Sequence, residues 1–145
     1  MKYEFKAKAV VNVDAPPSEV WNALTNPEII KQYLFGTEAI SDWKVGSKLE
    51  FKGEWEGKEY FDKGIITKFE PEKILQYTYL SSFSTLEDIP ENYNTITCKL
   101  QKRNGSTELT LTQDNIPTEE SKNHSEQNWN AVLNKLKEIV EQLNA

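Results

Sequence analysis

The sequence predicts an α+β fold in which an antiparallel sheet packs against a long C-terminal helix. Three observations lead to this prediction: apolar and polar residues alternate in several segments, turn residues separate those segments, and the last part of the chain repeats with a helical period. The chain has 145 residues, a common size for one domain, and we expect residues 1–145 to form a single domain.

The N-terminal part predicts one strand followed by two short helices. Residues 3–13 alternate between apolar and polar or charged side chains, which indicates a half-buried strand. Pro17 suits the first turn of a helix, since that position needs no N–H donor. Asn26 is a candidate cap for a second helix that begins at Pro27, and Gly36 provides its end.

The central part predicts a meander of five strands. Asn104-Gly105 is the strongest hairpin signal in the chain, because both residues tolerate a positive φ. Consecutive hairpins give antiparallel pairing, and with the N-terminal strand we expect a sheet of about six strands. The expected central strands cover residues 48–55, 58–69, 74–80, 93–102 and 106–114.

The C-terminal part predicts a long amphipathic helix that Thr118 caps. The same face turns polar toward the start of the helix, at Ser125 and Lys122. Such a change suits the mouth of a cavity and equally suits a helix end that projects beyond the sheet. The apolar face contains Trp129, Val132, Leu133, Leu136, Ile139, Val140 and Leu143.

Several segments resemble the START-like, Bet v1-like (SRPBCC) superfamily, and more narrowly the proteins related to the activator of Hsp90 ATPase. The similar segments are residues 15–28, 41–46, 64–71 and 129–136. The resemblance implies a helix-grip fold, with a curved sheet around the terminal helix and often a cavity between them. It implies no reaction, because the superfamily has no universal catalytic residues.

Composition and charge argue against several classes of protein. The net charge is −6 and the pI about 4.9, without the basic stripe that a nucleic-acid-binding protein needs. No apolar run is long enough for a membrane span, and the N-terminus lacks the apolar core of a signal peptide. The single cysteine, Cys98, falls on the apolar phase of its strand, where we expect a buried thiol. We therefore expect a cytoplasmic protein that binds no nucleic acid and does not insert into a membrane.

Residues with catalytic chemistry are scarce. His124 is the single histidine and lies off the apolar face of the last helix, which favours an exposed or rim position. Zinc-type sites need clusters of histidine and cysteine, and the chain has one of each, far apart in sequence. We expect no catalytic residue, no metal and no cofactor, and the balance is against an enzyme.

Candidate ligand-binding residues come from the aromatic side chains expected to face the interior and from the polar start of the last helix. Ordinary core packing is the alternative interpretation for each of them. A long acidic connection, residues 81–92, adds Phe83 as a residue that could cover a pocket. The complete set is Tyr33, Phe35, Phe51, Trp55, Phe61, Tyr77, Tyr79, Phe83, Ser125, Trp129 and Leu133.

The leading functional hypothesis is a small-molecule binding domain with an internal cavity for a hydrophobic, lipid-like or aromatic ligand. One alternative is a protein-interaction module with a chaperone partner, as the resemblance to the Hsp90 activator implies. A further alternative is a cyclase-like or hydratase-like enzyme that uses isolated groups such as His124, Asp62 and the two tyrosines Tyr77 and Tyr79.

Overall fold

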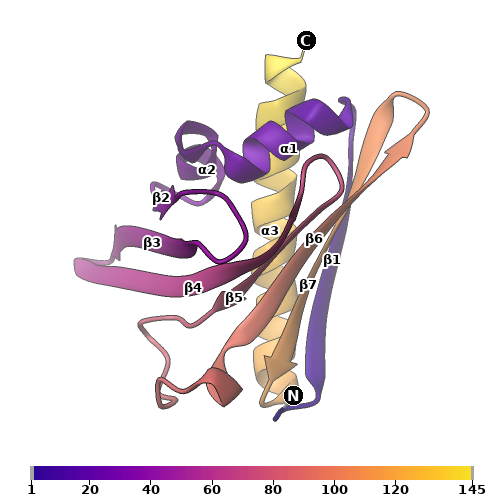
Figure 1. Ribbon diagram of the computed structural model, residues 1–145. Coiled ribbons are helices and arrows are strands. Elements are labelled where there is room, and N and C mark those ends of the chain that lie inside the picture. Colours follow the sequence, from indigo (N-terminus) through magenta and orange to yellow (C-terminus); the bar gives the residue numbers. More distant parts are fainter. Residues whose placement is uncertain (1, 145) are drawn as a thin grey trace.

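The computed structural model describes residues 2–144, in which a curved sheet holds a long helix on one face (Figure 1). The elements follow the predicted order, with one additional short strand and one short 3-10 helix. They are β1 (Phe5–Val13), α1 (Pro17–Thr25), α2 (Pro27–Tyr33), β2 (Glu38–Ser41), β3 (Lys48–Trp55), β4 (Lys58–Glu70), β5 (Ile74–Tyr79), the short 3-10 helix η1 (Pro90–Asn92), β6 (Asn94–Arg103), β7 (Ser106–Ile116) and α3 (Glu119–Leu143).

Within the described residues, seven strands form one antiparallel sheet in the order β1-β7-β6-β5-β4-β3-β2. The expectation of about six strands missed β2. This strand has four residues and pairs with β3, from Glu38 opposite Lys52 to Ser41 opposite Leu49. Four residues are too few for alternation to identify a strand, so β2 had no sequence signal of its own.

The predicted turns and caps are confirmed. Asn104 and Gly105 have φ values of 46° and 91°, as a tight hairpin turn requires. The Asn26 side chain accepts a hydrogen bond from the Glu28 N–H at 3.1 Å. Thr118 caps α3 in the same way, accepting from the Ser121 N–H at 3.1 Å. These local contacts fix where α2 and α3 begin, and thereby how α3 meets the sheet.

The core lies between α3 and the sheet. Figure 1 shows α3 running along one face of the sheet, with α1 and α2 near the end where α3 finishes. Trp21 and Leu24 of α1 belong to the same buried cluster, and the Trp21 ring packs edge-on against Phe69 at 5.2 Å between centroids. Trp21 therefore fixes α1 against the end of β4. The buried residues of α3 are Val132, Leu133, Leu136, Ile139 and Val140.

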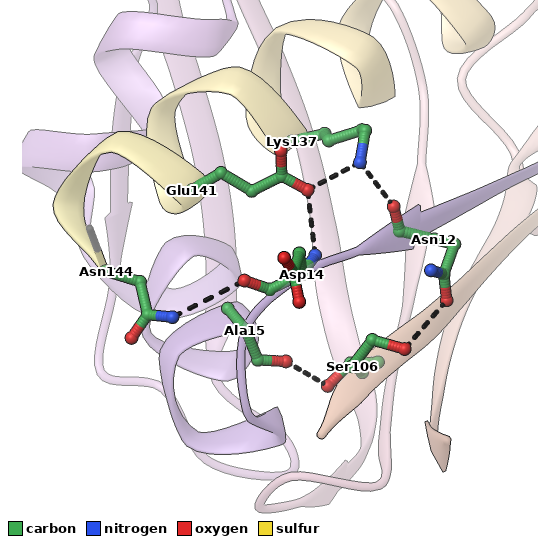
Figure 2. Close-up of polar contacts among 8 residues, drawn as sticks. Asn12, Asp14, Ala15, Ser106, Lys137, Glu141 and Asn144 are labelled. Atoms are coloured by element: carbon green, nitrogen blue, oxygen red, sulfur yellow. Dashed lines mark hydrogen bonds and ion pairs between the residues drawn. The ribbon is translucent and has the colours of Figure 1, made fainter. Parts of the chain in front are cut away.

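Side chains of α3 also cover the edge of β1 (Figure 2). The Asp14 N–H donates to Glu141 Oε2 at 2.8 Å, and Lys137 Nζ donates to the Asn12 carbonyl at 2.8 Å. Lys137 also pairs with Glu141 at 2.5 Å. An edge strand otherwise presents free N–H and C=O groups, so these contacts satisfy two backbone groups at the end of that edge and help to fix α3 against it. No helix within residues 2–144 is both long and apolar enough to cross a membrane.

Candidate ligand cleft

The space enclosed between α3 and the sheet is small. Its volume is about 40 Å³, whereas ligand sites usually have volumes of about 300–1,000 Å³. Leu133 and Leu136 of α3, with Leu49 and Leu111 of the sheet, are among the buried side chains that line it. The internal cavity expected from the sequence is therefore too small for an organic ligand and has room for about one or two water molecules.

A larger cleft opens beside this filled core, at the N-terminal half of α3. Its volume is about 540 Å³, within the range of ligand sites. Phe51, Tyr77, Trp129 and Val132 line both the cleft and the enclosed space, so the two are neighbours. The cleft is lined by Leu34, Phe35, Thr37, Phe51, Glu54, Tyr60, Asp62, Tyr77, Tyr79, Ser81, Phe83, Gln113, His124, Ser125, Asn128, Trp129 and Val132.

Most of the residues predicted from the sequence meet in this cleft. Tyr33 and Leu133 line the small enclosed space instead. The side chain of Trp55 lies outside the described part of the structure, although its backbone ends β3. Those that line the cleft are Phe35, Phe51, Tyr77, Tyr79, Phe83, Ser125 and Trp129.

The prediction that Phe61 faces the interior is wrong, because its side chain lies on the opposite face of the sheet. The two-residue turn between β3 and β4 pairs Phe51 with Asp62, so Asp62 shares the inward face with Phe51. Phe61 is 40% exposed, and Lys52 Nζ lies 5.5 Å from its ring centroid. A turn of this length places the even-numbered residues from Asp62 to Ile66 inside, and the prediction had the opposite phase.

Asp62 is the main polar group of the cleft wall. It is 7% exposed and accepts hydrogen bonds from the Tyr79 hydroxyl at 2.5 Å and the Ser82 N–H at 2.8 Å. The pKa of Tyr79 lies well above its usual range. Burial is the largest cause, and the negative charge of the Asp62 carboxylate is the second. Tyr79 therefore remains a neutral donor, and Asp62 ties the start of the 81–92 connection to β4.

The buried phenols of Tyr33 and Tyr77 are also neutral. Burial raises the pKa of Tyr33 and of Tyr77 well above the usual tyrosine value. The Tyr33 hydroxyl donates to the Ala23 carbonyl at 2.9 Å, so α1 satisfies this buried group. The Tyr77 ring lies 6.0 Å from the Phe51 ring between centroids and forms part of the cleft floor.

Trp129 is held in place at the junction of cleft and core. Its indole Nε1–H donates to Gln113 Oε1 at 2.8 Å. Gln113 in turn donates to Asn94 Oδ1 at 3.0 Å, so β7 and β6 position this side chain. The apolar face of the indole is thereby left beside the cleft, and its N–H has a fixed partner.

Tyr60 is a cleft residue that sequence reasoning missed. Its ring lies 6.0 Å from the Phe83 ring between centroids, and its hydroxyl hydrogen-bonds with the Thr37 hydroxyl. Gly53 is its cross-strand partner, and a Cβ atom at Gly53 would collide with the Tyr60 ring. A glycine inside a strand often marks such a close approach, so Gly53 was the available signal.

The single histidine and cysteine lie where the sequence predicted. His124 is exposed and lines the rim of the cleft. Cys98 is a buried core residue, and burial raises the pKa of its thiol to about 12, so the thiol stays protonated and unreactive. Among residues 2–144, no group of three or more His, Cys, Asp and Glu side chains is arranged to hold a metal ion.

Comparison with known proteins identifies relatives along most of the chain. The family described as activator of Hsp90 ATPase homolog 1-like protein matches residues 14–141. The solution structure of ChR145 from Cytophaga hutchinsonii is 46% identical, with 100% of both chains covered and a TM-score of 0.84. No curated protein sequence matches the chain.

Two more distant structures share the fold. The Aha1 dimer from Colwellia psychrerythraea is 20% identical over 94% of this chain and 96% of that chain, with a TM-score of 0.75. An HSP90 activator from Plasmodium falciparum is 22% identical over 77% and 74%, with a TM-score of 0.62. The family match covers most of the chain, and its structural relatives have the same architecture. The chain belongs to the family of activator of Hsp90 ATPase homolog 1-like proteins.

Proposed function

We propose that this protein binds a small amphipathic molecule in the cleft at the N-terminal half of α3. The observation that carries the proposal is a ligand-sized cleft of about 540 Å³ with aromatic walls and a few fixed polar groups. The binding site is thus the open cleft beside the core, and the small enclosed space behind it contributes only its wall.

The shape and chemistry of the cleft support binding without catalysis. Aromatic side chains lose little conformational freedom when a ligand covers them, and each buries a large apolar area. The polar groups are already engaged: Asp62 with Tyr79 and Ser82, and Trp129 with Gln113. Fixed groups of this kind orient a ligand, since they need no rearrangement when it arrives.

NMR titration of the ¹⁵N-labelled protein with 4-phenylbutanol, a neutral amphipathic probe, tests the proposal. The Trp129 indole N–H gives a separate resonance at the junction of cleft and core, so it reports directly on occupancy. We expect saturable shifts of this resonance and of backbone amides at residues 124–132, 60–62 and 81–83. Shifts confined to other surfaces, or no saturable shift at millimolar probe, would contradict the proposal.

The second candidate is a protein-interaction module that acts on an Hsp90-type chaperone. It is favoured by the family description and by the HSP90 activator from Plasmodium falciparum among the structural relatives. In this case the outer surface would make the contacts, and an occupied cleft would be unnecessary.

A chaperone ATPase assay separates the two candidates. Added protein should raise the ATPase rate of an Hsp90 in a saturable way if the second candidate is correct. An unchanged rate, together with no co-sedimentation of the two proteins, would remove it. The small-molecule proposal predicts that 4-phenylbutanol binding persists in either case.

A further inference from the structure

The charged groups of the cleft are acidic. Glu54 lies at its rim and Asp62 in its wall. Among the described residues that line the cleft, there is no lysine or arginine, and the one histidine, His124, is on the rim. A small molecule in the cleft therefore meets negative charge and no permanent positive charge.

Asp62 is a buried carboxylate whose hydrogen-bond partners are neutral. They are the Tyr79 hydroxyl and the N–H and hydroxyl of Ser82. None of the ion pairs in the described part of the chain includes Asp62. A charge that is removed from water without an opposite charge is costly, so a cation beside Asp62 would regain interaction energy that the protein itself does not supply.

The aromatic walls favour the same kind of ligand. The π-face of an aromatic ring attracts a cation, and the attraction grows when both are removed from water. Quaternary ammonium groups are typically bound in cages of such rings. Within the described residues, seven rings line the cleft: Phe35, Phe51, Tyr60, Tyr77, Tyr79, Phe83 and Trp129.

We infer that the cleft selects organic cations, namely amines or quaternary ammonium compounds with an apolar body. The apolar body would lie against the rings, and the cationic group would lie near Asp62, with Glu54 at the entrance. This inference rests on the proposed function, because it names the ligand class of the same cleft. The neutral probe above and the charged probes below therefore test different claims.

A matched series of three probes tests the selection. Trimethyl(4-phenylbutyl)ammonium is the cation, 4-phenylbutanol the neutral member and 4-phenylbutane-1-sulfonate the anion, and each is titrated by following the Trp129 indole resonance. We expect the cation to bind about tenfold tighter than the alcohol, and the anion to bind weakest. Because the phenylbutyl group is common to all three, the differences report on charge.

Substitutions locate the source of the preference. Asp62→Asn keeps the shape and should reduce the cation-to-alcohol ratio of affinities to about threefold or less. Glu54→Gln should reduce the ratio by about twofold, since Glu54 is exposed. Glu70→Gln is the matched control: it removes the same charge at the far end of β4, roughly 26 Å along the strand from Asp62. It should leave the ratio unchanged.

The outcomes are distinguishable. Binding of none of the probes would overturn the proposed function and this inference together. Equal binding of all three would overturn the inference and leave the proposed function intact. A Glu70→Gln effect as large as that of Asp62→Asn would show that the net charge of −6 attracts the cation nonspecifically, which also overturns the inference. Because Asp62 also anchors a loop, Glu54→Gln provides the test that does not depend on that loop staying folded.

Discussion

The two halves of α3 use the same inward face differently. In the C-terminal half, Leu136 and Val140 are buried in the core, and Lys137 and Glu141 are fixed to the edge of β1 (Figure 2). In the N-terminal half, Ser125 lies beside a cleft of about 540 Å³. One helix thus closes the sheet at one end and leaves it open at the other.

If the cleft binds a ligand as proposed, this difference separates the residues that stabilise the fold from those that bind. The closed half removes most of its apolar surface from water, which stabilises the folded state. The open half keeps aromatic rings at a surface that a ligand can reach, with Trp129 at the boundary between the two. Changes in the two halves should therefore affect different measurements.

The largest expected effect on stability is at Leu136, whose side chain is fully buried. Leu136→Ala should lower the free energy of unfolding by about 2–5 kcal/mol, because it removes apolar contacts and leaves a cavity. Urea denaturation measures this change. Ser125→Ala at the open half is the matched comparison and should change stability by less than about 0.5 kcal/mol. Similar losses for both variants would contradict the separation of the two halves.

A smaller effect is expected at Tyr33, which links α2 to α1 within the closed region. Tyr33→Phe removes the hydroxyl that donates to the Ala23 carbonyl and should lower stability by about 1 kcal/mol. The ring remains, so the shape of the core is kept. Thermal or urea denaturation checks the change, and a variant as stable as the wild type would show that water replaces this hydrogen bond.

The smallest expected effect is at the edge contact of Glu141. In the folded protein the pKa of Glu141 is lowered below 4.5. The hydrogen bond with Lys137 is the largest cause, and the hydrogen bond from the Asp14 N–H is the second. The contact therefore stabilises the fold above about pH 4.5, and the stabilisation is lost as pH falls through the folded-state pKa. Glu141→Gln should cost less than about 1 kcal/mol at pH 7, since the pair is partly exposed.

The control for this prediction is the pH dependence of the stability difference between the two proteins. The stability difference between wild type and Glu141→Gln should shrink toward zero when urea denaturation is repeated at about pH 3. A difference that stays constant from pH 7 to pH 3 would mean that the carboxylate charge contributes nothing at this position.

Much of the fold was predictable because local signals determine it. Asn104-Gly105 requires a tight turn, Thr118 caps α3, and the helical repeat from Trp129 onward marks the buried face. Each signal depends on a few neighbouring residues. The strand β2 was not predictable in this way, because only its pairing with β3, which lies further along the chain, identifies these four residues as a strand.

The candidate site was predictable only in part. The change from Trp129 to Ser125 along α3 suited both a cavity mouth and a projecting helix end, and the sequence could not choose between them; in the structure both residues line the cleft. The direction of Phe61 depended on the register of one hairpin, and the role of Asp62 depended on a tertiary contact with Tyr79. How far side chains fill the enclosed space depends on packing in three dimensions, and alternation along the sequence gives no measure of it.

The central claim is that the open half of α3 forms a ligand site that does not contribute to the stability of the fold. The most direct test compares Ser125→Trp with Gln127→Trp, which places the same side chain on the exposed face of the same helix. Affinity for trimethyl(4-phenylbutyl)ammonium and for 4-phenylbutanol, measured by calorimetry, should fall by at least about tenfold in Ser125→Trp alone. Both variants should keep the urea midpoint of the wild type. Equal affinities in the two variants would contradict the account.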